Sequence, residues 1–259
     1  MKHPKSRETK TNTIEIIREI LKAPIRIIKK IIRIPEYYII YSGKRLYCPV
    51  CEKHSRKFKR YGIIPRDNAR CFICGSFERH RLVWLYFTKK TNLFDEKPKK
   101  FLHIAPESCF VKKLRKRIGV GYLTTDIKNT KVMVKMDITN INYPDESFDV
   151  IYCSHVLEHI VDDMSAIREL HRILKRSGWA ILMVPIKGDK TFEDPLIKDP
   201  GERLKVFGQK DHVRIYGRDF VDRLKRGGFK VKEVAPSDFL TTDEISKMVI
   251  RGKIYYCTK

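Results

Sequence analysis

Short apolar runs alternate with amphipathic stretches along residues 99–259, and this alternation restricts the fold more than any other feature of the sequence. Several of the amphipathic stretches end in glycine, as helices often do. The pattern is typical of strand-helix-strand units whose parallel strands form a sheet covered on both faces. We therefore predict an α/β domain over residues 81–259, led in by a helical run that begins at Glu78.

Local sequence also predicts where one helix of this domain ends and which position one strand takes in the sheet. One long helix should bury a stripe with helical spacing, formed by Ile160, Met164, Ile167, Leu170 and Leu174. Gly178 is expected to stop that helix, because glycine readily adopts the conformation found at helix C-termini. The last apolar run, residues 253–259, is expected to form an edge strand.

The carboxyl ends of the strands are the places to seek a ligand site, since open parallel sheets bind ligands there. The first strand ends at Ala105, and Asp126 ends the second strand 21 residues later. That spacing is usual for an acid that binds the ribose hydroxyls of an adenosine. Asp137, at the end of the third strand, could accept a hydrogen bond from an adenine amino group. The fourth strand runs through Cys153 into residues 154–159, SHVLEH.

Residues 145–160, DESFDVIYCSHVLEHI, together with residues 166–186 resemble the class I S-adenosylmethionine-dependent methyltransferases. The resemblance covers residues 99–259 and implies a Rossmann-like seven-stranded sheet with helices on both faces, ending in an antiparallel hairpin. It implies S-adenosylmethionine as cofactor. The candidate cofactor-binding residues are Ala105, Pro106, Glu107, Ser108, Asp126, Asp137, Ile138, Ser154 and His155. Residues 207–231 also resemble methyltransferases found among enzymes of bacterial surface-polysaccharide biosynthesis.

The turn after the first strand departs from this family, because residues 105–108, APES, contain no glycine. Pro106 should fix the turn, and the amides of Glu107 and Ser108 should begin the next helix. A helix N-terminus favours an anion, so these amides could face the methionine carboxylate of the cofactor. Glu107 could instead bind the methionine ammonium group, or serve only as a favourable acid in the first helical turn. Both interpretations stay open, and the intact Asp126 argues against a domain that has lost its cofactor.

Two histidines are candidates for catalysis. Methyl transfer from a sulfonium requires an oriented acceptor and, when the acceptor is a hydroxyl, a base. His155 follows the fourth strand and His212 follows the fifth, and either could be that base. The alternative for each is a hydrogen-bonded loop histidine. Glu158 and His159 are expected to support the motif structurally. A divalent metal at this motif is a minority alternative, because His155 replaces the carboxylate that metal-binding relatives use.

Two CxxC pairs predict a metal site before the sheet domain. Cys48 and Cys51 are separated from Cys71 and Cys74 by 19 residues, the spacing of a four-thiolate zinc site. Gly75 should supply the tight turn after the second pair. With no open coordination position, the zinc would be structural. Residues 43–80 are therefore predicted to be a zinc-ribbon-like module.

Residues 1–42 are predicted to be a basic, amphipathic helical segment, kinked at Pro24. Residues 13–35 could lie on an anionic membrane or pack against the enzyme, and both alternatives stay open. Residues 1–90 contain 23 Lys and Arg against 7 Asp and Glu, a net charge of +16, which favours anionic partners. No apolar stretch is long enough for a membrane span, the start has no secretory apolar core, and free cysteines suit a reducing compartment. We expect a cytoplasmic protein, peripheral at the inner face of the membrane if that helix binds lipid.

The leading functional hypothesis is an S-adenosylmethionine-dependent methyltransferase that methylates an oxygen of a sugar, a glycan or another small acceptor. The second hypothesis is an RNA methyltransferase, because some rRNA methyltransferases resemble this chain in placing a four-ligand zinc module before the catalytic domain. The third is a scaffold protein whose methyltransferase domain is inactive. The (D/N)PP(Y/F) signature of enzymes that methylate base amino groups is absent after the fourth strand, which argues against that reaction.

Overall fold

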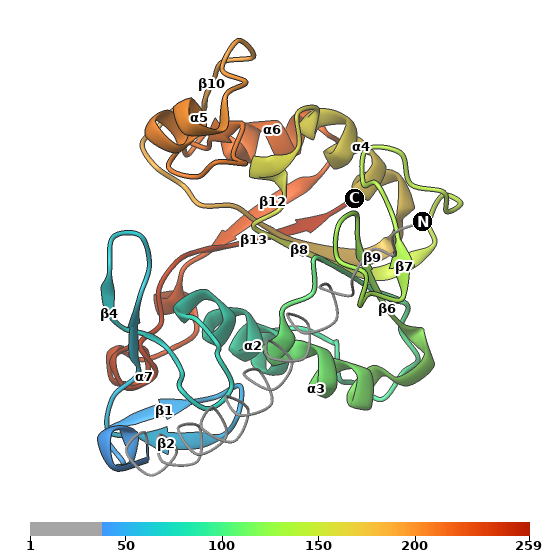
Figure 1. Cartoon of the computed structure of the whole chain (residues 1–259). Coiled ribbons are helices and arrows are strands. Elements are labelled where there is room, and N and C mark those ends of the chain that lie inside the picture. The colour runs from blue at the N-terminus through green and yellow to red at the C-terminus, as the bar shows by residue number, and fades with distance from the viewer. Residues whose placement is uncertain (1–37) are drawn as a thin grey trace, which may run out of the picture.

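The computed structural model describes residues 38–259, and its central feature is a seven-stranded mixed sheet (Figure 1). In spatial order the strands are β12 (Lys230–Val234), β13 (Ile254–Thr258), β9 (Leu174–Met183), β8 (Phe148–Ser154), β5 (Phe101–Ile104), β6 (Tyr122–Asp126) and β7 (Val134–Lys135). The strands from β9 to β7 are parallel, whereas β13 and β12 each run antiparallel to their neighbours. The predicted seven-stranded sheet with a terminal antiparallel hairpin is confirmed.

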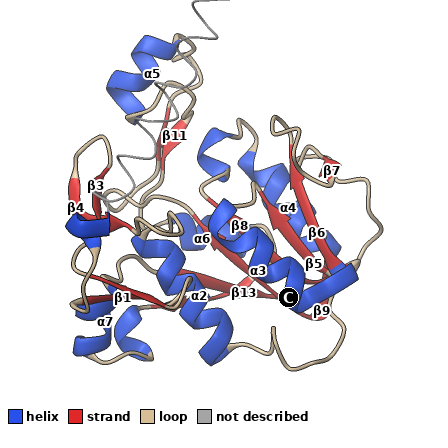
Figure 2. Cartoon of the chain, turned by 60° about the horizontal axis from the view of Figure 1, so that its bottom comes forward, coloured by secondary structure: helices blue, strands red, loops and turns tan. Residues whose placement is uncertain are grey.

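Helices cover both faces of this sheet. The covering helices are α2 (Glu78–Lys90), α3 (Ser108–Ile118), α4 (Asp163–Ile173), α6 (Phe220–Arg226) and α7 (Thr242–Met248). Helix α5 (Pro200–Phe207) lies away from the sheet (Figure 1). Buried residues of α2, α3 and α7 form one hydrophobic cluster with the sheet, and buried residues of α4 and α6 form the other. Figure 2 shows α2 and α3 in front of the strands. Successive strand residues alternate between the two clusters, as Val150 and Ile151 do, because side chains of a strand point to opposite faces.

The structure corrects the predicted end of the long helix. α4 ends at Ile173, and the chain enters β9 at once, so Gly178 lies within a strand and does not stop the helix. Long-range ion pairs hold the start of β9 in place, with Lys175 bonded to Asp149 and Arg176 bonded to Glu146. A β-carbon on Gly178 would lie 2.7 Å from the carbonyl oxygen of Asp149. Glycine is therefore needed here because the two strands approach too closely for a β-carbon.

The predicted edge position of the last strand is also wrong. β13 lies between β9 and β12, so β12 is the edge strand. The burial of the two strands explains the order, because β13 buries Ile254, Tyr255 and Cys257, whereas β12 exposes charged side chains. Charged residues on an edge strand oppose pairing with other chains.

Residues 46–76 form two small antiparallel hairpins beside the sheet. β1 (Leu46–Cys48) pairs with β2 (Lys53–Ser55), and β3 (Lys59–Tyr61) pairs with β4 (Arg66–Arg70). Most of their buried apolar residues, including Leu46, Cys48 and Phe58, belong to the same hydrophobic cluster as α2 and one face of the sheet. The boundary predicted at residue 80 falls inside α2.

Arg81 ties these hairpins to the C-terminal part of the chain. Its side chain is fully buried, and its guanidinium donates hydrogen bonds to five backbone carbonyl oxygens. Three of these acceptors lie in the hairpin region, at Asn68, Ala69 and Ser76, and two lie at the end of α7. A buried charge is tolerated only when its hydrogen bonds are satisfied, and this one is.

Smaller elements complete the described chain. β10 (Phe192–Glu193) pairs with β11 (Arg214–Ile215) above the sheet, and short 3₁₀ turns occupy Gly119–Gly121, Leu157–His159 and Pro236–Asp238. Within residues 38–259, no helix combines the length and the apolar character needed to cross a bilayer. The helix and the membrane contact predicted for residues 13–35 lie outside the described residues.

Candidate active site and metal centre

The predicted cofactor residues lie at one edge of the sheet. β5 is flanked by the parallel strands β6 and β8, so the carboxyl ends of all three strands meet at that edge. Ala105 follows β5 and His155 follows β8, and both have left-handed backbones, with φ of 48° and 58°. Residues other than glycine adopt this conformation at a cost, and such positions cluster at functional sites. Each amide is held by a neighbouring strand, since Ala105 N donates to Thr125 O and His155 N donates to Met183 O, both at 2.8 Å.

The loop after β5 continues into α3. Glu107 is the N-cap residue, and the helix begins at Ser108, which confirms the predicted helix start. The turn is made by Ala105 in a left-handed conformation followed by Pro106, where relatives of this fold use glycine. Contact of the Glu107 and Ser108 amides with a methionine carboxylate stays a prediction.

Two aspartates lie beyond the neighbouring strand ends. Asp126 ends β6, and its Oδ1 accepts hydrogen bonds from the amides of Lys128 and Asn129, at 2.7 and 2.8 Å. Asp137 follows β7, and its Oδ1 accepts hydrogen bonds from the amide and hydroxyl of Thr139. In both residues one carboxylate oxygen orients the loop, which leaves the second oxygen for a ligand. Ile138, beside Asp137, is buried.

Glu107 belongs to a buried polar network. Its carboxylate lies 2.7 Å from Nε2 of His103 and accepts a 3.0 Å hydrogen bond from the hydroxyl of Tyr152. Nδ1 of His103 lies 2.7 Å from the hydroxyl of Tyr122, and Nε2 of His80 lies 3.5 Å from the carboxylate. Burial raises the pKa of the Glu107 carboxyl, but the hydrogen bond and charge of His103 outweigh it and lower the pKa to about 2. Glu107 is therefore a carboxylate at neutral pH.

This network predicts stability that falls in acid. Burial, partly opposed by the charge of Glu107, lowers the pKa of His80 from 6.5 to about 3. Between these pH values the unfolded chain binds a proton that the folded chain does not, so the free energy of unfolding rises with pH. From pH 4.5 down to about 2, Glu107 adds a second contribution of the same sign. We expect the free energy of unfolding to fall steadily from pH 6.5 to pH 4, by up to about 1.4 kcal/mol per pH unit for each proton. The melting temperature should fall with it.

Replacing His80 with glutamine should flatten this pH dependence, measured as thermal unfolding by circular dichroism across the same range. Glutamine can still accept the hydrogen bond that the amide of Phe77 donates to Nδ1 of His80. The matched control is His54→Gln, since His54 is exposed. Equal pH dependence in wild type and His80→Gln would show that another group causes the acid sensitivity.

A second cluster lies beyond β8 and brings both candidate bases to one carboxylate. Nδ1 of His155 lies 3.2 Å from Oε1 of Glu158, which is 1% exposed, whereas the His155 side chain is 29% exposed. The ring of His212 lies 4.7 Å from that of His159, and one ligand atom from each of Glu158, His159 and His212 falls within 4.8 Å of the others. Burial and the charge of His159 lower the pKa of His212, which keeps that ring neutral at pH 7.

The arrangement of these side chains depends on Arg214, at the start of β11. Its guanidinium donates hydrogen bonds to the carbonyl oxygens of Leu157, Ile160 and Val161, which fixes the turn that carries Glu158. The amide of Val213 donates to the Glu158 carbonyl oxygen at 2.9 Å. Glu158 Oε2 and His212 Nε2 are buried and have no hydrogen-bond partner among the described residues. Two histidines and one carboxylate are a suitable ligand set for a divalent cation, and here Glu158 and His212 have unused atoms while Nδ1 of His159 contacts Asp211.

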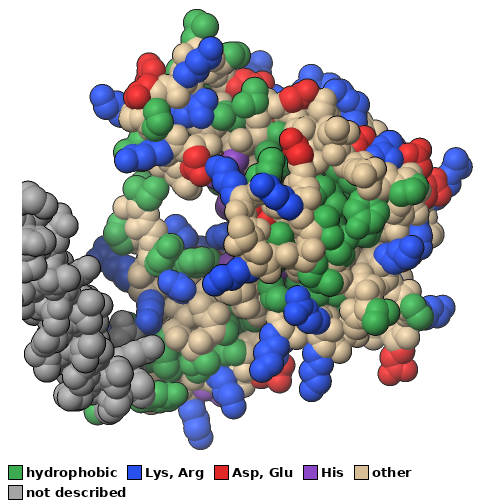
Figure 3. All heavy atoms as spheres, turned by 45° about the vertical axis from the view of Figure 1, so that its right-hand side comes forward, with side chains coloured by type: hydrophobic (Ala, Val, Ile, Leu, Met, Phe, Trp, Pro, Cys, Tyr) green, Lys and Arg blue, Asp and Glu red, His purple; other side chains and the backbone are tan. Residues whose placement is uncertain are grey.

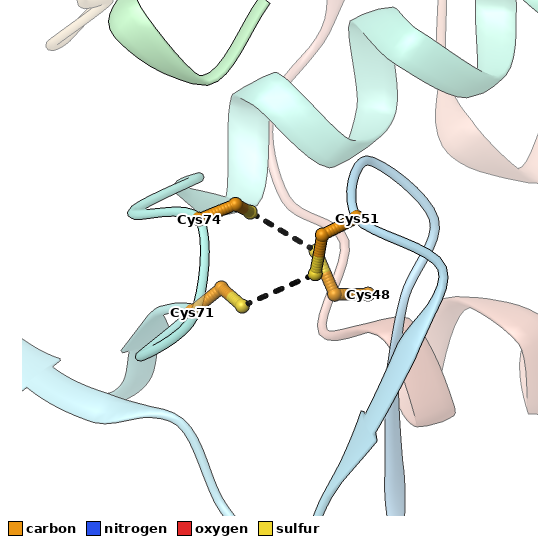
Figure 4. A group of neighbouring side chains, drawn as sticks. All are labelled: Cys48, Cys51, Cys71 and Cys74. Carbon is orange, nitrogen blue, oxygen red and sulfur yellow. Dashed lines mark hydrogen bonds between the residues drawn. The ribbon is translucent and has the colours of Figure 1, made fainter. Parts of the chain in front are cut away.

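The four cysteines predicted as metal ligands converge on one point (Figure 4). Sγ of Cys48 lies 3.7 Å from Sγ of Cys74, and Sγ of Cys51 lies 3.8 Å from Sγ of Cys71. A tetrahedron with zinc–sulfur bonds of about 2.3 Å has sulfur–sulfur edges of about 3.8 Å. The cluster is therefore compatible with a zinc ion.

The turns around the cysteines support this arrangement. Each CxxC pair is followed by a left-handed residue, Glu52 with φ of 57° and Gly75 with φ of 75°. The amide of Glu52 donates to Cys48 O, and that of Gly75 donates to Cys71 O, which closes each turn. The buried hydroxyl of Ser76 lies 3.1 Å from Cys48 Sγ and 3.2 Å from Cys74 Sγ, where it can donate to a thiolate. Partners of this kind orient metal ligands.

A pocket of about 520 Å³ opens next to His155. One wall is formed by the last residue of β9 and the three residues after it, from Met183 to Ile186, and another by the start of α2, at Glu78 and Arg79. Tyr255 of β13 also lines it. The space-filling view shows a hollow with histidine inside and Lys and Arg side chains around it (Figure 3). This volume is typical of a small-molecule site.

Sequence reasoning missed two features of this region. Glu158 was expected to be a structural support, and its contact with His155 is an i,i+3 pair that the spacing could have indicated. The contribution of Arg66 and Arg79 to the pocket had no local signal, because these residues lie more than 70 positions before His155 in the chain.

Comparison with known proteins supports the methyltransferase hypothesis at the level of the domain. A family model described as a methyltransferase domain matches residues 101–182. The uncharacterized methyltransferase YcgJ of Bacillus subtilis is 32% identical over 75 residues, which cover 29% of this chain and 28% of that protein. The uncharacterized protein MJ0638 of Methanocaldococcus jannaschii is 30% identical over 119 residues, which cover 46% of this chain and 47% of that protein. The chain therefore spans less than half the length of these relatives.

Among solved structures, an S-adenosylmethionine-dependent methyltransferase from Mesorhizobium loti is 13% identical, with a TM-score of 0.48. The alignment covers 68% of this chain and 97% of that chain. The domain match to residues 101–182 includes β5, α3, β6 and β8, the elements that place Ala105, Asp126 and His155. It supports an S-adenosylmethionine-dependent methyltransferase domain over that part of the sheet.

Proposed function

We propose that the protein is an S-adenosylmethionine-dependent O-methyltransferase in which His155, oriented by Glu158, removes the proton of an acceptor hydroxyl. The observation that carries this proposal is the 3.2 Å contact between Nδ1 of His155 and the buried carboxylate of Glu158. A carboxylate on Nδ1 holds the proton there, so Nε2 becomes the acceptor. His155 also lines the 520 Å³ pocket, where an acceptor can reach it.

The cofactor would lie across the carboxyl ends of β5, β6 and β8. The free oxygen of Asp126 suits the ribose hydroxyls, and Asp137 with Ile138 suits the adenine. The amides of Glu107 and Ser108, at the start of α3, suit the methionine carboxylate. When bound, the cofactor supplies a methyl group on a positively charged sulfur, which an acceptor oxygen can attack in line.

The residues of the chain then have two tasks in the reaction. The pocket walls orient the acceptor so that its oxygen faces the methyl group, which converts an encounter into a positioned attack. Nε2 of His155 accepts the hydroxyl proton as the oxygen–carbon bond forms, and Glu158 stabilises the resulting imidazolium. No covalent enzyme intermediate is needed.

The proposal includes a structural zinc held by Cys48, Cys51, Cys71 and Cys74. Four thiolates complete a tetrahedral site and leave no open position for a substrate, so the metal would stabilise the hairpins and not take part in chemistry. A sugar, glycan or other small molecule is proposed as the acceptor, because the pocket beside His155 has the size of a small-molecule site. Association of residues 13–35 with an anionic membrane belongs to the same proposal.

Binding of S-adenosylhomocysteine provides the direct test. We expect calorimetry to show one site per chain, and Asp126→Ala to weaken the affinity by about 10- to 100-fold, since a charge-assisted pair of hydrogen bonds is lost. The control is Asp145→Ala, which removes an exposed acid at the opposite edge of the sheet.

The outcomes of this titration separate the functional hypotheses. An inactive scaffold would bind no S-adenosylhomocysteine, and Asp126→Ala would change nothing. An RNA methyltransferase would bind the cofactor and also copurify with RNA in a strongly salt-dependent manner. Equal affinity of wild type and Asp126→Ala, with tight binding in both, would place the ribose elsewhere.

A further inference from the structure

The pocket beside His155 has an excess of positive charge. Five cationic side chains line it, and only two carboxylates do. The cationic residues are Arg66, Arg79, Arg218, Arg251 and Lys253. Because cationic side chains attract negative groups, this excess indicates that the ligand of the pocket is an anion.

The two carboxylates are already neutralised by two of the cations. Glu78 forms a two-pronged hydrogen bond with Arg66, with distances of 3.0 and 3.3 Å. Glu233 bonds to Lys253 at 3.0 Å. The charges of the three remaining arginines are therefore not neutralised by the carboxylates that line the pocket.

The remaining arginines differ in how they are held. Arg79 has no carboxylate partner among the described residues; its guanidinium lies 5.2 Å from the ring centre of Phe77, and its Nε is buried without a hydrogen-bond partner. Arg251 is exposed and has no hydrogen-bond or ion-pair partner within residues 38–259. Arg218 has only a 3.3 Å contact with Asp189, and both side chains are 81% exposed. A buried, unsatisfied guanidinium nitrogen is costly unless a ligand satisfies it.

These arginines come from separate elements that meet only in the folded protein. Arg79 lies in α2, directly after the cysteine hairpins, Arg218 lies before α6, and Arg251 lies between α7 and β13. They converge at the carboxyl edge of the sheet, on the side where His155 is found. Arginine forks match the geometry of phosphate and bind it with two hydrogen bonds.

We propose that the acceptor is a small phosphorylated molecule, such as a sugar phosphate or a nucleotide-activated sugar, whose phosphate is bound by Arg79 and Arg251. This inference rests on the proposed function, because it identifies the ligand of the pocket that His155 lines. The volume of about 520 Å³ accommodates a molecule of that size, and it favours a small acceptor over a polymer. The hairpins of residues 46–76 then contribute to recognition of the phosphate, since they lead directly into the start of α2, where Arg79 lies.

The experiment uses the full chain saturated with S-adenosylhomocysteine, titrated by calorimetry with uridine diphosphate and, separately, with inorganic pyrophosphate. Wild type is expected to bind both. Arg79→Gln and Arg251→Gln should each weaken the binding by about tenfold, as expected for one lost charge-assisted contact, and the double variant should weaken it further. Affinity for S-adenosylhomocysteine should change less than about twofold. Arg176→Gln, at the opposite end of β9, is the matched control.

The outcomes distinguish this inference from the function on which it rests. Binding of S-adenosylhomocysteine without binding of either phosphate probe would overturn the inference and leave the methyltransferase intact. Arginine-dependent binding of the probes without binding of S-adenosylhomocysteine would support the anion site and reject the proposed function. Weaker S-adenosylhomocysteine binding by Arg79→Gln, with unchanged phosphate binding, would assign Arg79 to the cofactor and also overturn the inference.

A final arm tests the size of the ligand. Single-stranded RNA is titrated under the same conditions as uridine diphosphate. Tighter binding of RNA that Arg79→Gln and Arg251→Gln both weaken would assign this site to RNA and overturn the proposal of a small acceptor. Tighter binding of uridine diphosphate would support the proposal.

Discussion

A Cys71→Ser variant is expected to lose the metal of the cysteine cluster and at least about 10 °C of thermal stability. Cys71 is 1% exposed, and its Sγ lies 3.8 Å from that of Cys51, so serine cannot replace it as a soft, ionised ligand. The three remaining thiolates would have to bind the ion without a complete tetrahedron. Because the hairpins share a hydrophobic cluster with α2 and the sheet, the loss should extend beyond the hairpins.

Elemental analysis and thermal unfolding measure this effect together. Wild type should contain about one zinc per chain, and Cys71→Ser close to none. Cys109→Ala is the control, because Cys109 lies outside the cluster and contacts His80 instead. Purified wild type without bound metal, or a Cys71→Ser variant that keeps one zinc per chain, would contradict the assignment.

The second large effect is expected at His155. Replacing it with glutamine should lower methyl transfer by about 10²- to 10⁴-fold, because the proton acceptor is removed while the surroundings are kept. Binding of S-adenosylhomocysteine should remain nearly unchanged. Glu158→Gln should reduce the rate less, because it leaves His155 in place without its orienting charge.

Transfer of labelled methyl groups from S-adenosylmethionine into fractionated cell extract provides the assay while the acceptor is being identified. His171→Gln is the matched control, since His171 packs against Phe229 on the far side of α4 and touches no residue of the pocket. If His212→Gln abolishes transfer and His155→Gln does not, the base is His212. If transfer stops on addition of a chelator and returns with Mg²⁺, the cluster of Glu158, His159 and His212 holds a cation.

The sheet and the strand ends could be predicted because their signals are local. β8 and the second half of β9 are largely apolar runs, Asp126 is the last residue of β6, and Asp137 lies two residues after β7. Parallel pairing then places these ends at one edge without further information. The same reasoning located His155.

Other parts of the site depend on contacts between distant segments, which no local pattern reports. Glu107 could be identified as the start of a helix, but its partner Tyr152 lies 45 residues away in another strand. α4 ends where Leu174 begins to pair with Phe148 of β8, and Lys175 and Arg176 then bond to residues 26 and 30 positions earlier. Helical periodicity continues through this segment, so the sequence alone favours a longer helix.

The hydrogen bonds of Arg81 have a consequence for folding during synthesis. The cysteine hairpins leave the ribosome early, but two of the carbonyl groups that bind this guanidinium belong to residues made 167 and 168 positions later. Until those residues emerge, a charged side chain at the centre of the hairpin region lacks part of its coordination and must stay hydrated. The N-terminal hairpins should therefore complete their native structure only after the end of α7 has been translated, which makes folding of the whole chain a late event.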